Sequence, residues 1–483
     1  MYIGIDLGTS GVKILLLSGD NKVVKTVTKG YDLLIPKPEW TEQNPLDWYN
    51  QTIVGLKEII KGYEKDLKAI SFSGQMHGMV LLDKNDKVIR NALLWNDQRT
   101  IKEVEYLNEV IGKERLIKET GNIALTGLTA PKVLWVKNNE EENYKRIDKV
   151  MLPKDYLIYR LSGIFASDTS DTSGTLYYDV ENKKYSKYML DVLGLKENNF
   201  PKIFESYEVV GYLTEEVKVQ LGVKNDVKIV AGGGDQAVGA VGVGAVYNGM
   251  CNISLGTSGV VFSPMEKFAS DQKTYLQSYV HSNGKYMMMG VMLNAAGALK
   301  WWNEGIFNNY NYENIFDKIS KTSSDDDLFF LPYLTGERAP INDPYARGAF
   351  VGLRLEHKKE HLDRAVVEGI TFNLKAIFEI IKTKNKDLKN VRITGGGAKS
   401  PIWGQMIADI LNTSVETILV EEGPALGAAI LAMVADGKYE TVEDACNEII
   451  EVKHIFKPNS KEVLIYEKKY NEYMKVYPKL NNW

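Results

Sequence analysis

The hexapeptide Leu-Gly-Thr-Ser-Gly-Val occurs twice in this chain, and this repeat constrains the fold more than any other sequence feature. It fills residues 7–12 and recurs, letter for letter, at residues 255–260 of a chain of 483. Six identical residues at a spacing close to half the chain length indicate two related domains, each presenting the same turn. The sequence therefore predicts one domain over residues 1–245 and a second over residues 246–483.

Each copy of the hexapeptide lies between two apolar segments, a pattern that predicts a β-hairpin with a polar tip. Glycine permits close approach of the backbone, so such a tip can direct several N–H groups and two hydroxyls at an anion, for which phosphate is the natural candidate. The two copies differ in charge, because Asp6 and Lys13 beside the first correspond to Ser254 and Val261 beside the second. Only the first turn carries charge.

Length and charge narrow the class of protein. A chain of 483 residues is too long for one hydrophobic core. Its 59 basic and 63 acidic side chains are interleaved and leave a net charge of −4, which argues against partners such as nucleic acid or an anionic membrane. Cys251 and Cys446 are far apart, as is typical of a reducing compartment, and a disulfide between them is the less favoured alternative. We therefore expect a cytoplasmic protein whose partners are small molecules.

The first half follows a strand, turn, strand, helix, strand pattern that is typical of α/β domains. An apolar strand ending at Ser73 runs into a Gly-Gln-Met-His-Gly segment, residues 74–78. A single histidine is ordinarily a satisfied core or turn residue, but the flanking glycines favour a ligand pocket around Met76 and His77. The polar residues 96–99 after the next apolar segment are interpreted as a helix cap, with Asn96 or Asp97 at the cap.

Three glycines, residues 232–234, precede Asp235 and leave room for a substrate to approach its carboxylate. The position also suggests a helix N-cap, and a cap with one free oxygen can still accept a proton. Residues 168–174 resemble a metal loop but lack the glutamate that a calcium loop requires, so we interpret them as an Asx/Ser-rich turn. A second triple glycine, residues 395–397, joins a strand to a helix, where backbone can lie against a planar or anionic ligand; a simple tight connection is an equal alternative.

Together these features predict a polyphosphorylated ligand that bridges two domains, with an acid facing its end. Neither a GxxxxGK[ST] loop nor the HRD-type loop of protein kinases occurs in the sequence. A different scaffold for phosphoryl transfer is therefore required.

The combination resembles the actin/hexokinase/Hsp70 superfamily of ATPases and, within it, the FGGY carbohydrate kinases. Residues 127–136 are similar to the first signature of that family and residues 348–368 to its second, and the resemblance runs along essentially the whole chain. The resemblance implies an α/β fold of two related actin-like (ribonuclease H-like) domains with a deep cleft between them. Closer similarity to members that act on D-xylulose lies in residues 75–78, 94–97, 152–156 and 332–338.

The resemblance also implies a role for each part of the site. Asp235 would be the general base that takes the proton of the attacking sugar hydroxyl, and Asp6, with Asp235 beside it, would hold Mg²⁺. Met76, His77 and Gln236 would contact the sugar, and Gln236 stands where the members acting on xylulose often have Asn. ATP would be bound by residues from both halves: Thr9, Ser10, Gly11 and Lys13 at the transferred phosphoryl group, Gly256 and Thr257 at the nucleotide phosphates, and Gly396, Gly397 and Ser400 along adenosine.

The implied activity is ATP-dependent phosphorylation of a ketopentose, with D-xylulose as the expected substrate. Two alternatives remain open: the same chemistry on ribulose, gluconate or glycerol, and a nucleotide-switched binding or filament-forming protein on the same scaffold. Asp235 and the pocket at Met76 and His77 argue against the second alternative. Similar kinases suggest a homodimer.

Overall fold

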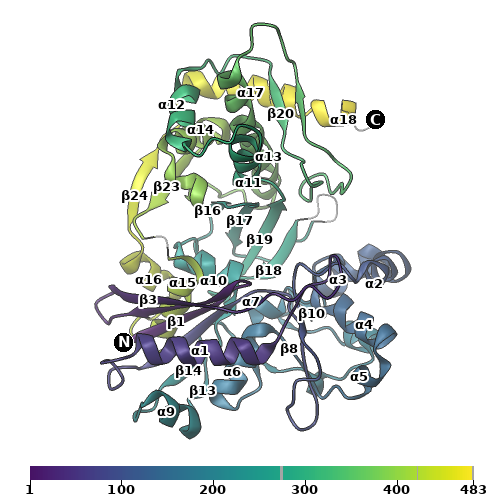
Figure 1. Cartoon of the computed structure of the whole chain (residues 1–483), viewed down its shortest axis with the longest axis vertical. Coiled ribbons are helices and arrows are strands. Elements are labelled where there is room, and N and C mark those ends of the chain that lie inside the picture. The colour runs from purple at the N-terminus through teal and green to yellow at the C-terminus, as the bar shows by residue number, and fades with distance from the viewer. Residues whose placement is uncertain (272–275, 421, 481–483) are drawn as a thin grey trace.

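The computed structural model describes residues 1–271, 276–420 and 422–480, and it contains two large β-sheets in two lobes (Figure 1). The strands of the first sheet are β1 (Tyr2–Leu7), β2 (Gly11–Leu17), β3 (Val23–Gly30), β5 (Ala69–Gly74), β13 (Val209–Tyr212), β14 (Lys228–Val230) and β15 (Gly233–Gly234). Those of the second are β16 (Met250–Leu255), β17 (Gly259–Met265), β18 (Gln277–Val280), β19 (Tyr286–Met292), β22 (Asn390–Thr394), β23 (Ser414–Ile418) and β24 (Val452–Phe456).

The two sheets repeat one strand order. The first runs β3-β2-β1-β5-β14-β13, and the second runs β19-β17-β16-β22-β23-β24 with β18 added at its edge. In both, the hairpin that carries the hexapeptide is antiparallel, its first strand pairs in parallel with the next strand, and the far edge strand is antiparallel again. The expectation of two related α/β domains is confirmed at the level of sheet topology.

The identical hexapeptides close in different registers. Leu7 pairs with Val12, which leaves a tip of residues 8–11, whereas Leu255 pairs with Gly259, which leaves a tip of residues 256–258. The carbonyl of Thr257 accepts hydrogen bonds from Ala295 and Gly297, at the start of the next helix. The second turn is therefore shaped by its contact with that helix as well as by its own sequence.

Helices cover both sheets. In the N-terminal half they are α1 (Pro45–Ile59), α2 (Ile101–Glu105), α3 (Lys113–Thr120), α4 (Thr129–Asn139), α5 (Glu141–Lys145), α6 (Pro153–Ser162), α7 (Thr169–Thr172), α8 (Lys187–Leu193), α9 (Glu215–Leu221) and α10 (Asp235–Gly242). In the C-terminal half they are α11 (Ala296–Lys300), α12 (Tyr312–Lys321), α13 (Lys359–Lys384), α14 (Pro401–Leu411), α15 (Gly423–Ala435), α16 (Val442–Ile449), α17 (Ser460–Tyr473) and α18 (Val476–Leu480). Short strand pairs complete the fold: β4 (Glu42–Gln43) with β7 (Ala92–Leu93), β6 (Val80–Leu82) with β8 (Lys149–Met151), β9 (Ala166–Asp168) with β12 (Lys202–Phe204), β10 (Tyr178–Asp179) with β11 (Lys184–Tyr185), and β20 (Phe329–Leu331) with β21 (Ala349–Val351).

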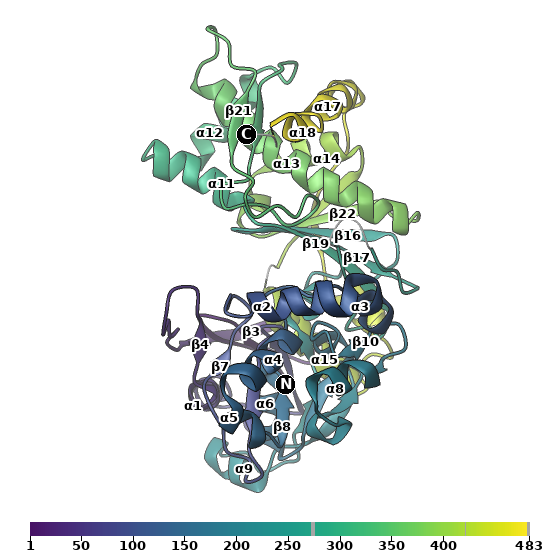
Figure 2. The same cartoon turned by 90° about the vertical axis from the view of Figure 1, so that its right-hand side faces the viewer.

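Helix α15 lies late in the chain but packs against the first sheet, beside β1 and α10, in both Figure 1 and Figure 2. Small residues make this contact possible, because a Cβ on Gly4 would lie 1.9 Å from the carbonyl oxygen of Ala425. Leu426 and Ile430 share one buried cluster with Tyr2 of β1. The C-terminal half of the sequence therefore contributes a helix to the core beneath the first sheet, and the division near residue 245 stays a prediction.

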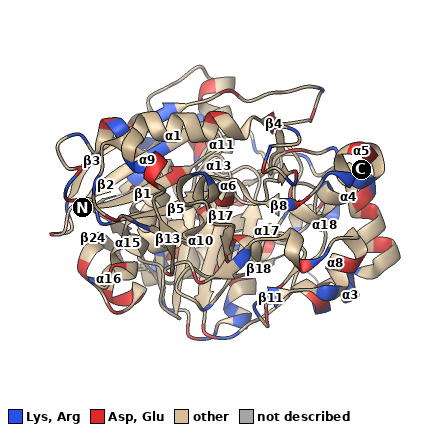
Figure 3. Ribbon diagram, turned by 90° about the horizontal axis from the view of Figure 1, so that it is seen from below, with Lys and Arg blue, Asp and Glu red and all other residues tan. Residues whose placement is uncertain are grey.

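Surface charge and hydropathy agree with the composition. Acidic and basic residues are interspersed along the ribbon in Figure 3. Both cysteines, Cys251 and Cys446, are buried and free. Within the described ranges, no helix combines the length and the apolar character needed to cross a bilayer.

Candidate functional site

Asp6 and Asp235 are brought together by strand β5. Asp6 lies near the end of β1 opposite Ser73 of β5, whose hydroxyl donates to Asp6 Oδ1 over 2.9 Å. Asp235 follows β15, which pairs in parallel with β5 through Gly233 and Ser73. Two carboxylates that are distant in sequence are thus held at the same end of neighbouring strands.

The environment of this pair makes both carboxylates weaker acids than usual. Burial raises the pKa of Asp6 to about 6, against the hydrogen bond from Ser73 and the charge of Lys13. Burial, followed by the negative charge of Asp6, raises the pKa of Asp235 to about 7. Both residues still keep part of their surface accessible, so a ligand can reach them. A carboxylate of this kind can accept a proton near neutral pH more readily than an ordinary aspartate.

Asp235 does not cap its helix, which corrects the sequence interpretation. Gly234 occupies the cap position without a side-chain cap bond, and Asp235 is the first residue of α10. The hydrogen bond recorded for its carboxylate comes from Gln236 Nε2 and is long, at 3.4 Å. The carboxylate is therefore available for chemistry rather than used for capping.

The donor set at Asp6 and Asp235 is compatible with a hydrated magnesium ion. Mg²⁺ keeps several waters and is commonly bound through one or two carboxylates together with substrate phosphates. Among the residues that the structure describes, no cluster of three or more His, Cys, Asp or Glu is arranged as a complete metal cage. Two mutually repelling, partly accessible carboxylates fit a metal that arrives with its phosphate ligand.

The first hexapeptide turn is held firmly by its neighbours. Thr9 Oγ1 donates to Gln75 Oε1 over 3.1 Å and accepts Trp95 Nε1–H over 3.0 Å, while Ser10 is exposed. The N–H of Gly8 donates to the carbonyl of Gly11 over 3.1 Å. The hydroxyl of Thr9 is thus already engaged, whereas the hydroxyl of Ser10 faces solvent.

Lys13 does not stand free beside this turn. Its ammonium group lies 2.5 Å from Glu422 Oε2, and Glu422 directly precedes helix α15. The phosphoryl contact expected of Lys13 therefore requires an exchange of partners, from this carboxylate to the phosphate.

Met76 and His77 pack against glycines from two other segments, Gly174 and Gly234. His77 Nδ1 lies 2.8 Å from the carbonyl of Gly174, so Nδ1 carries the proton and Nε2 is left as an acceptor. Burial and the charge of Lys132 lower the pKa of His77 to about 3, which keeps the ring neutral. A Cβ on Gly234 would lie 2.9 Å from Met76 Sδ. This cluster combines a sulfur, a neutral imidazole and, in the residue after Gly234, the carboxylate of Asp235.

Two cationic residues near His77 were not identified in the sequence analysis, and the first of them is Lys132. Lys132 is fully buried and donates to the carbonyls of His77, over 2.7 Å, and Gly127, and burial lowers its pKa to about 7. The signal for Lys132 was its place within the stretch 127–136, which was recognised as a motif but not assigned residue by residue.

Arg338 follows strand β20 and lies close enough to His77 and Tyr279 to affect the pKa of both groups. Its charge adds to burial and Lys132 in lowering the pKa of His77, and it opposes the rise that burial causes in the pKa of Tyr279. Within the described part of the chain, its guanidinium has neither a hydrogen bond nor an ion pair with another side chain. Its loop is anchored, because Glu337 Oε1 accepts the N–H groups of Leu293 and Arg338, each over 2.8 Å. In the sequence, the only signal for Arg338 was its place in the motif at residues 332–338.

A cavity of about 710 Å³ lies in the second lobe, against the second hexapeptide turn and the triple glycine. Ser400 caps helix α14 by accepting the N–H of Trp403, and a Cβ on Gly397 would lie 2.7 Å from the Trp403 ring. The cavity is lined by all five residues expected at the nucleotide in this half, namely Gly256, Thr257, Gly396, Gly397 and Ser400.

The polar residues 96–99 do not cap a helix, contrary to the sequence interpretation. Helix α2 begins at Ile101 without a side-chain cap bond. Asp97 is buried, accepts the N–H of Thr41 over 2.7 Å and is paired with Arg99 at 2.8 Å. These residues instead fix the loop that carries Trp95 over the first turn. The turn predicted at residues 168–174 is corrected in part: Asp168 accepts the N–H of Ser170 over 2.7 Å, as in an Asx turn, but it does so as the N-cap of the short helix α7.

Comparison with known proteins matches the chain along almost its whole length. Residues 1–242 match the N-terminal domain and residues 251–435 the C-terminal domain of the FGGY family of carbohydrate kinases. The xylulose kinase of Bacillus subtilis (strain 168) is 38% identical over 480 residues, or 98% of this chain and 96% of that protein. The crystal structure of a xyloylose kinase from Brucella ovis superposes with a TM-score of 0.94 at 33% identity, covering 100% of this chain and 99% of that one. The crystal structure of gluconate kinase from Lactobacillus acidophilus superposes with a TM-score of 0.93 at 28% identity, covering 99% and 97%.

Proposed function

The chain belongs to the FGGY family of carbohydrate kinases, and on this premise we propose that it transfers the terminal phosphoryl group of ATP to D-xylulose. The observation that carries the proposal is the placement of Asp235, a carboxylate with a raised pKa and no capping duty, directly after Gly234, which packs against Met76. The product would be D-xylulose 5-phosphate, with ADP as the leaving group.

Asp235 acts as the general base. It accepts the proton of the attacking hydroxyl as the oxygen–phosphorus bond forms and the bond to ADP breaks. Phosphoryl transfer passes through a loose transition state, so the protein mainly aligns the reacting atoms and stabilises charge. We expect the charge on the phosphoryl group to be stabilised by the exposed hydroxyl of Ser10, the backbone at Gly11 and the ammonium of Lys13. Lys13 must first leave Glu422.

Mg²⁺ is part of the proposal. Asp6 and Asp235 would hold it, and when bound it would neutralise phosphate oxygens. The cytoplasm as location and a homodimer as assembly also belong to the proposal; the free buried cysteines and interspersed charges support the first.

The sugar is oriented by neutral groups. With Nδ1 bound to Gly174, His77 presents Nε2 as an acceptor for a sugar hydroxyl. Gln236 offers an amide one residue after the base, and Met76 supplies an apolar surface. ATP would occupy the cavity of the second lobe, with Gly256 and Thr257 along its phosphates and Gly396, Gly397 and Ser400 along adenosine.

A second candidate substrate, gluconate, is favoured by one observation. The guanidinium of Arg338 lies near His77, and among the described residues it forms no ion pair, although the charge of the adjacent Glu337 acts on it. It could therefore bind the carboxylate of a sugar acid as a charge-assisted pair. The similarity to a gluconate kinase points the same way. Ribulose and glycerol remain the weaker alternatives.

The experiment is a coupled ADP-release assay on a panel of D-xylulose, L-ribulose, D-ribulose, D-gluconate and glycerol. We expect D-xylulose to give the highest kcat/KM. A preference for gluconate would change the substrate but keep the kinase, whereas a panel without any acceptor would overturn the enzyme assignment and favour a nucleotide-switched binding protein.

The variant Arg338→Met separates the two substrate assignments. For D-xylulose we expect a rise in KM of less than about tenfold, since a neutral sugar loses at most a hydrogen bond to a charged donor. For gluconate we expect a loss of about 100-fold or more, because the carboxylate loses its counter-ion. Equal losses on both sugars would argue against a role of Arg338 in distinguishing the two substrates. Arg354, an exposed arginine paired with Asp326, gives a matched control as Arg354→Met.

A further inference from the structure

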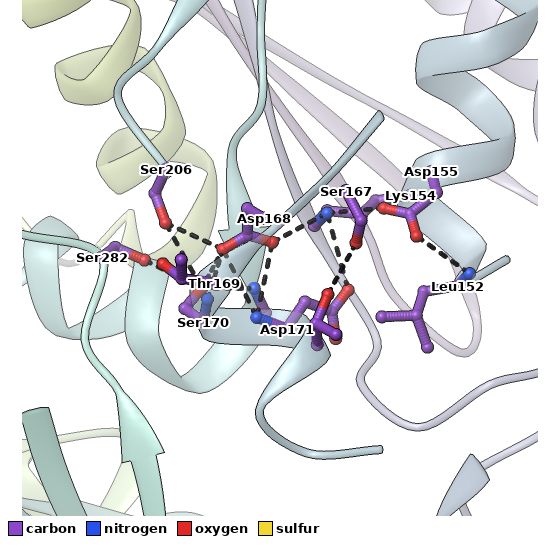
Figure 4. A network of polar contacts seen from close by, with 12 residues as sticks. Leu152, Lys154, Asp155, Ser167, Asp168, Thr169, Ser170, Asp171, Ser206 and Ser282 are labelled. Atoms are coloured by element: carbon purple, nitrogen blue, oxygen red, sulfur yellow. Dashed lines mark hydrogen bonds and ion pairs between the residues drawn. The ribbon is translucent and has the colours of Figure 1, made fainter. Parts of the chain in front are cut away.

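A buried polar network, drawn in Figure 4, contacts the backbone that precedes the catalytic aspartate. At one end is Lys154, whose side chain is completely buried and whose Nζ lies 2.7 Å from Asp155 Oδ1 and 2.8 Å from Asp168 Oδ1. A charge without solvent is stable only when it is paired and hydrogen-bonded, so Lys154 and Asp168 fix each other's position.

Asp168 in turn fixes the position of the Ser170 hydroxyl. The Ser170 hydroxyl donates to Asp168 Oδ2 over 2.5 Å, so its proton is committed to the carboxylate. Its oxygen then accepts the backbone N–H of Gly234 over 3.2 Å. Gly234 is the residue immediately before Asp235, and its N–H finds this partner outside the helix that follows.

The backbone at residue 233 lies so close to Ser170 that this residue must be glycine. A Cβ on Gly233 would lie 2.4 Å from Ser170 Oγ and 2.7 Å from Ser282 Oγ. Ser282 comes from the segment between β18 and β19, and its hydroxyl donates to Ser170 Oγ over 3.3 Å. The strand that leads to Asp235 is therefore held against Ser170 from one side and against the second half of the chain from another.

Asp235 depends on this fixed backbone, because its own carboxylate has few hydrogen-bond partners. Among the described residues only Gln236 hydrogen-bonds to its carboxylate, through its backbone and through a long 3.4 Å bond from its side chain, so the direction of the carboxylate is set by the backbone at residues 233–236. A general base loses most of its effect when it is displaced by about 1 Å from the proton it takes.

We propose that Lys154, Asp168 and Ser170, here called the positioning network, orient the carboxylate of Asp235 towards the sugar by fixing the backbone at Gly234. The inference rests on the proposed sugar-kinase function. The three residues are positioning residues, since none of them touches a substrate. The competing explanation is that the network only stabilises the fold.

Ser170→Ala and Ser206→Ala form a matched pair that separates these explanations. Both serines are completely buried, and both hydroxyls donate to Asp168 Oδ2, Ser206 over 2.9 Å. Ser206 also makes a longer contact of 3.4 Å to Ser170 Oγ. Only Ser170 also accepts the N–H of Gly234. A purely structural network predicts similar effects of both substitutions, whereas positioning predicts a loss of turnover in Ser170→Ala alone.

Both variants and the wild type are assayed as full-length protein for sugar phosphorylation, for ATP hydrolysis without sugar, and for amide hydrogen exchange of residues 232–236. For Ser170→Ala we expect kcat on the sugar to fall about 10- to 100-fold, with the KM for ATP and the sugar-independent hydrolysis unchanged. Faster exchange at Gly234 and Asp235 should accompany this loss. Ser206→Ala should lose thermal stability to a similar degree but keep its kcat within about twofold of the wild type.

Equal kcat values in the two variants, or a parallel fall of phosphorylation and hydrolysis, would overturn the inference. A wild type that phosphorylates no sugar would instead overturn the proposed function, so the two failures are distinct. Should Ser170→Ala not fold, Ser170→Cys keeps the volume but offers a poor acceptor; it should show the same loss of kcat, and a kcat equal to the wild type would refute positioning.

Discussion

At the scale of single residues, the site contains buried titratable groups whose shifted pKa values lower the stability of the fold and favour reactivity. Burial raises the pKa of Asp6 to about 6, and burial together with the negative charge of Asp6 raises the pKa of Asp235 to about 7. His77 is kept neutral by its surroundings, with one nitrogen committed to Gly174. The residues expected to carry the chemistry are therefore among those whose pKa values the fold has shifted from their ordinary range.

The raised pKa of Asp235 predicts the pH dependence of the reaction. A general base must be ionised, so kcat/KM for the sugar should rise with pH and level off above about 7. Magnesium and ATP are held saturating so that only the enzyme titrates. The variant Asp235→Asn should lose about 10³-fold in kcat and show no such rise, while its affinity for ATP, measured by calorimetry, stays within about threefold. A wild-type rate that is flat from pH 5 to 8 would contradict the assignment.

The same residue predicts a gain in stability on substitution. An unfolded aspartate has a pKa of about 3.9, so between that pH and about 7 the folded protein binds a proton that the unfolded chain has released. The contribution of Asp235 to the free energy of unfolding therefore becomes less favourable as pH rises through this window. Asp235→Asn lacks this penalty, and its melting temperature should exceed that of the wild type by a few degrees at pH 8 but by less at pH 5. A lower melting temperature at pH 8 would be inconsistent with a strained carboxylate.

At the level of elements, the site is assembled by β5, α10 and α15. Strand β5 pairs with both β1 and β15 and so places Asp6 beside Asp235. Helix α10 starts at the base, and α15 packs across it with glycines at the contact: a Cβ on Gly427 would lie 1.9 Å from the carbonyl of Val238, and one on Gly242 would lie 2.0 Å from that of Gly423. This backbone contact holds the base-bearing helix against the sheet.

Gly427→Ala should therefore disturb the site from a distance. Its new methyl group meets backbone rather than a movable side chain, so we expect a loss of about 1–3 kcal/mol in the free energy of unfolding, together with reduced sugar turnover. Gly239→Ala is the control on the facing helix, because its Cβ would meet only the ring of Pro424 at 3.4 Å. Chemical denaturation measures both variants, and equal stabilities would rule out the close α10–α15 contact as an important one.

At the level of the whole molecule, the proposed site draws on both lobes. The residues lining the cavity for ATP all come from the second half, between Leu255 and Trp403, whereas Asp235, Met76 and His77 belong to the first. Transfer then requires the lobes to approach, and approach removes the water that would otherwise take the phosphoryl group.

This arrangement predicts a slow ATPase in the absence of sugar. Hydrolysis without an acceptor should be about 100-fold slower than phosphorylation of the best sugar. Small-angle scattering should show a smaller radius of gyration when the sugar and a non-hydrolysable ATP analogue are both added than with either alone. Rapid hydrolysis without sugar, together with an unchanged radius, would mean that the site is formed without closure.

Much of the architecture is encoded locally. The repeated hexapeptide predicted two hairpins. Both hairpins are present, and the two sheets that contain them have the same strand order. The reason is local, since alternating and apolar patterns around a glycine turn define a hairpin wherever they occur. The carboxylate after three glycines and the Met-His pair were recognisable for the same reason: unusual local composition marks backbone that must leave space for a ligand.

Other features depend on contacts between residues that are distant in the chain, and only the tertiary structure decided them. Identical hexapeptides took different registers because one of them receives hydrogen bonds from helix α11. Asp97 became half of a buried ion pair, Arg338 came to lie near His77, and α15 returned to the first sheet. Sequence patterns determine which segments become strands, turns and helices, whereas the partner of a buried charge or a close-packed glycine is set by packing across the whole fold.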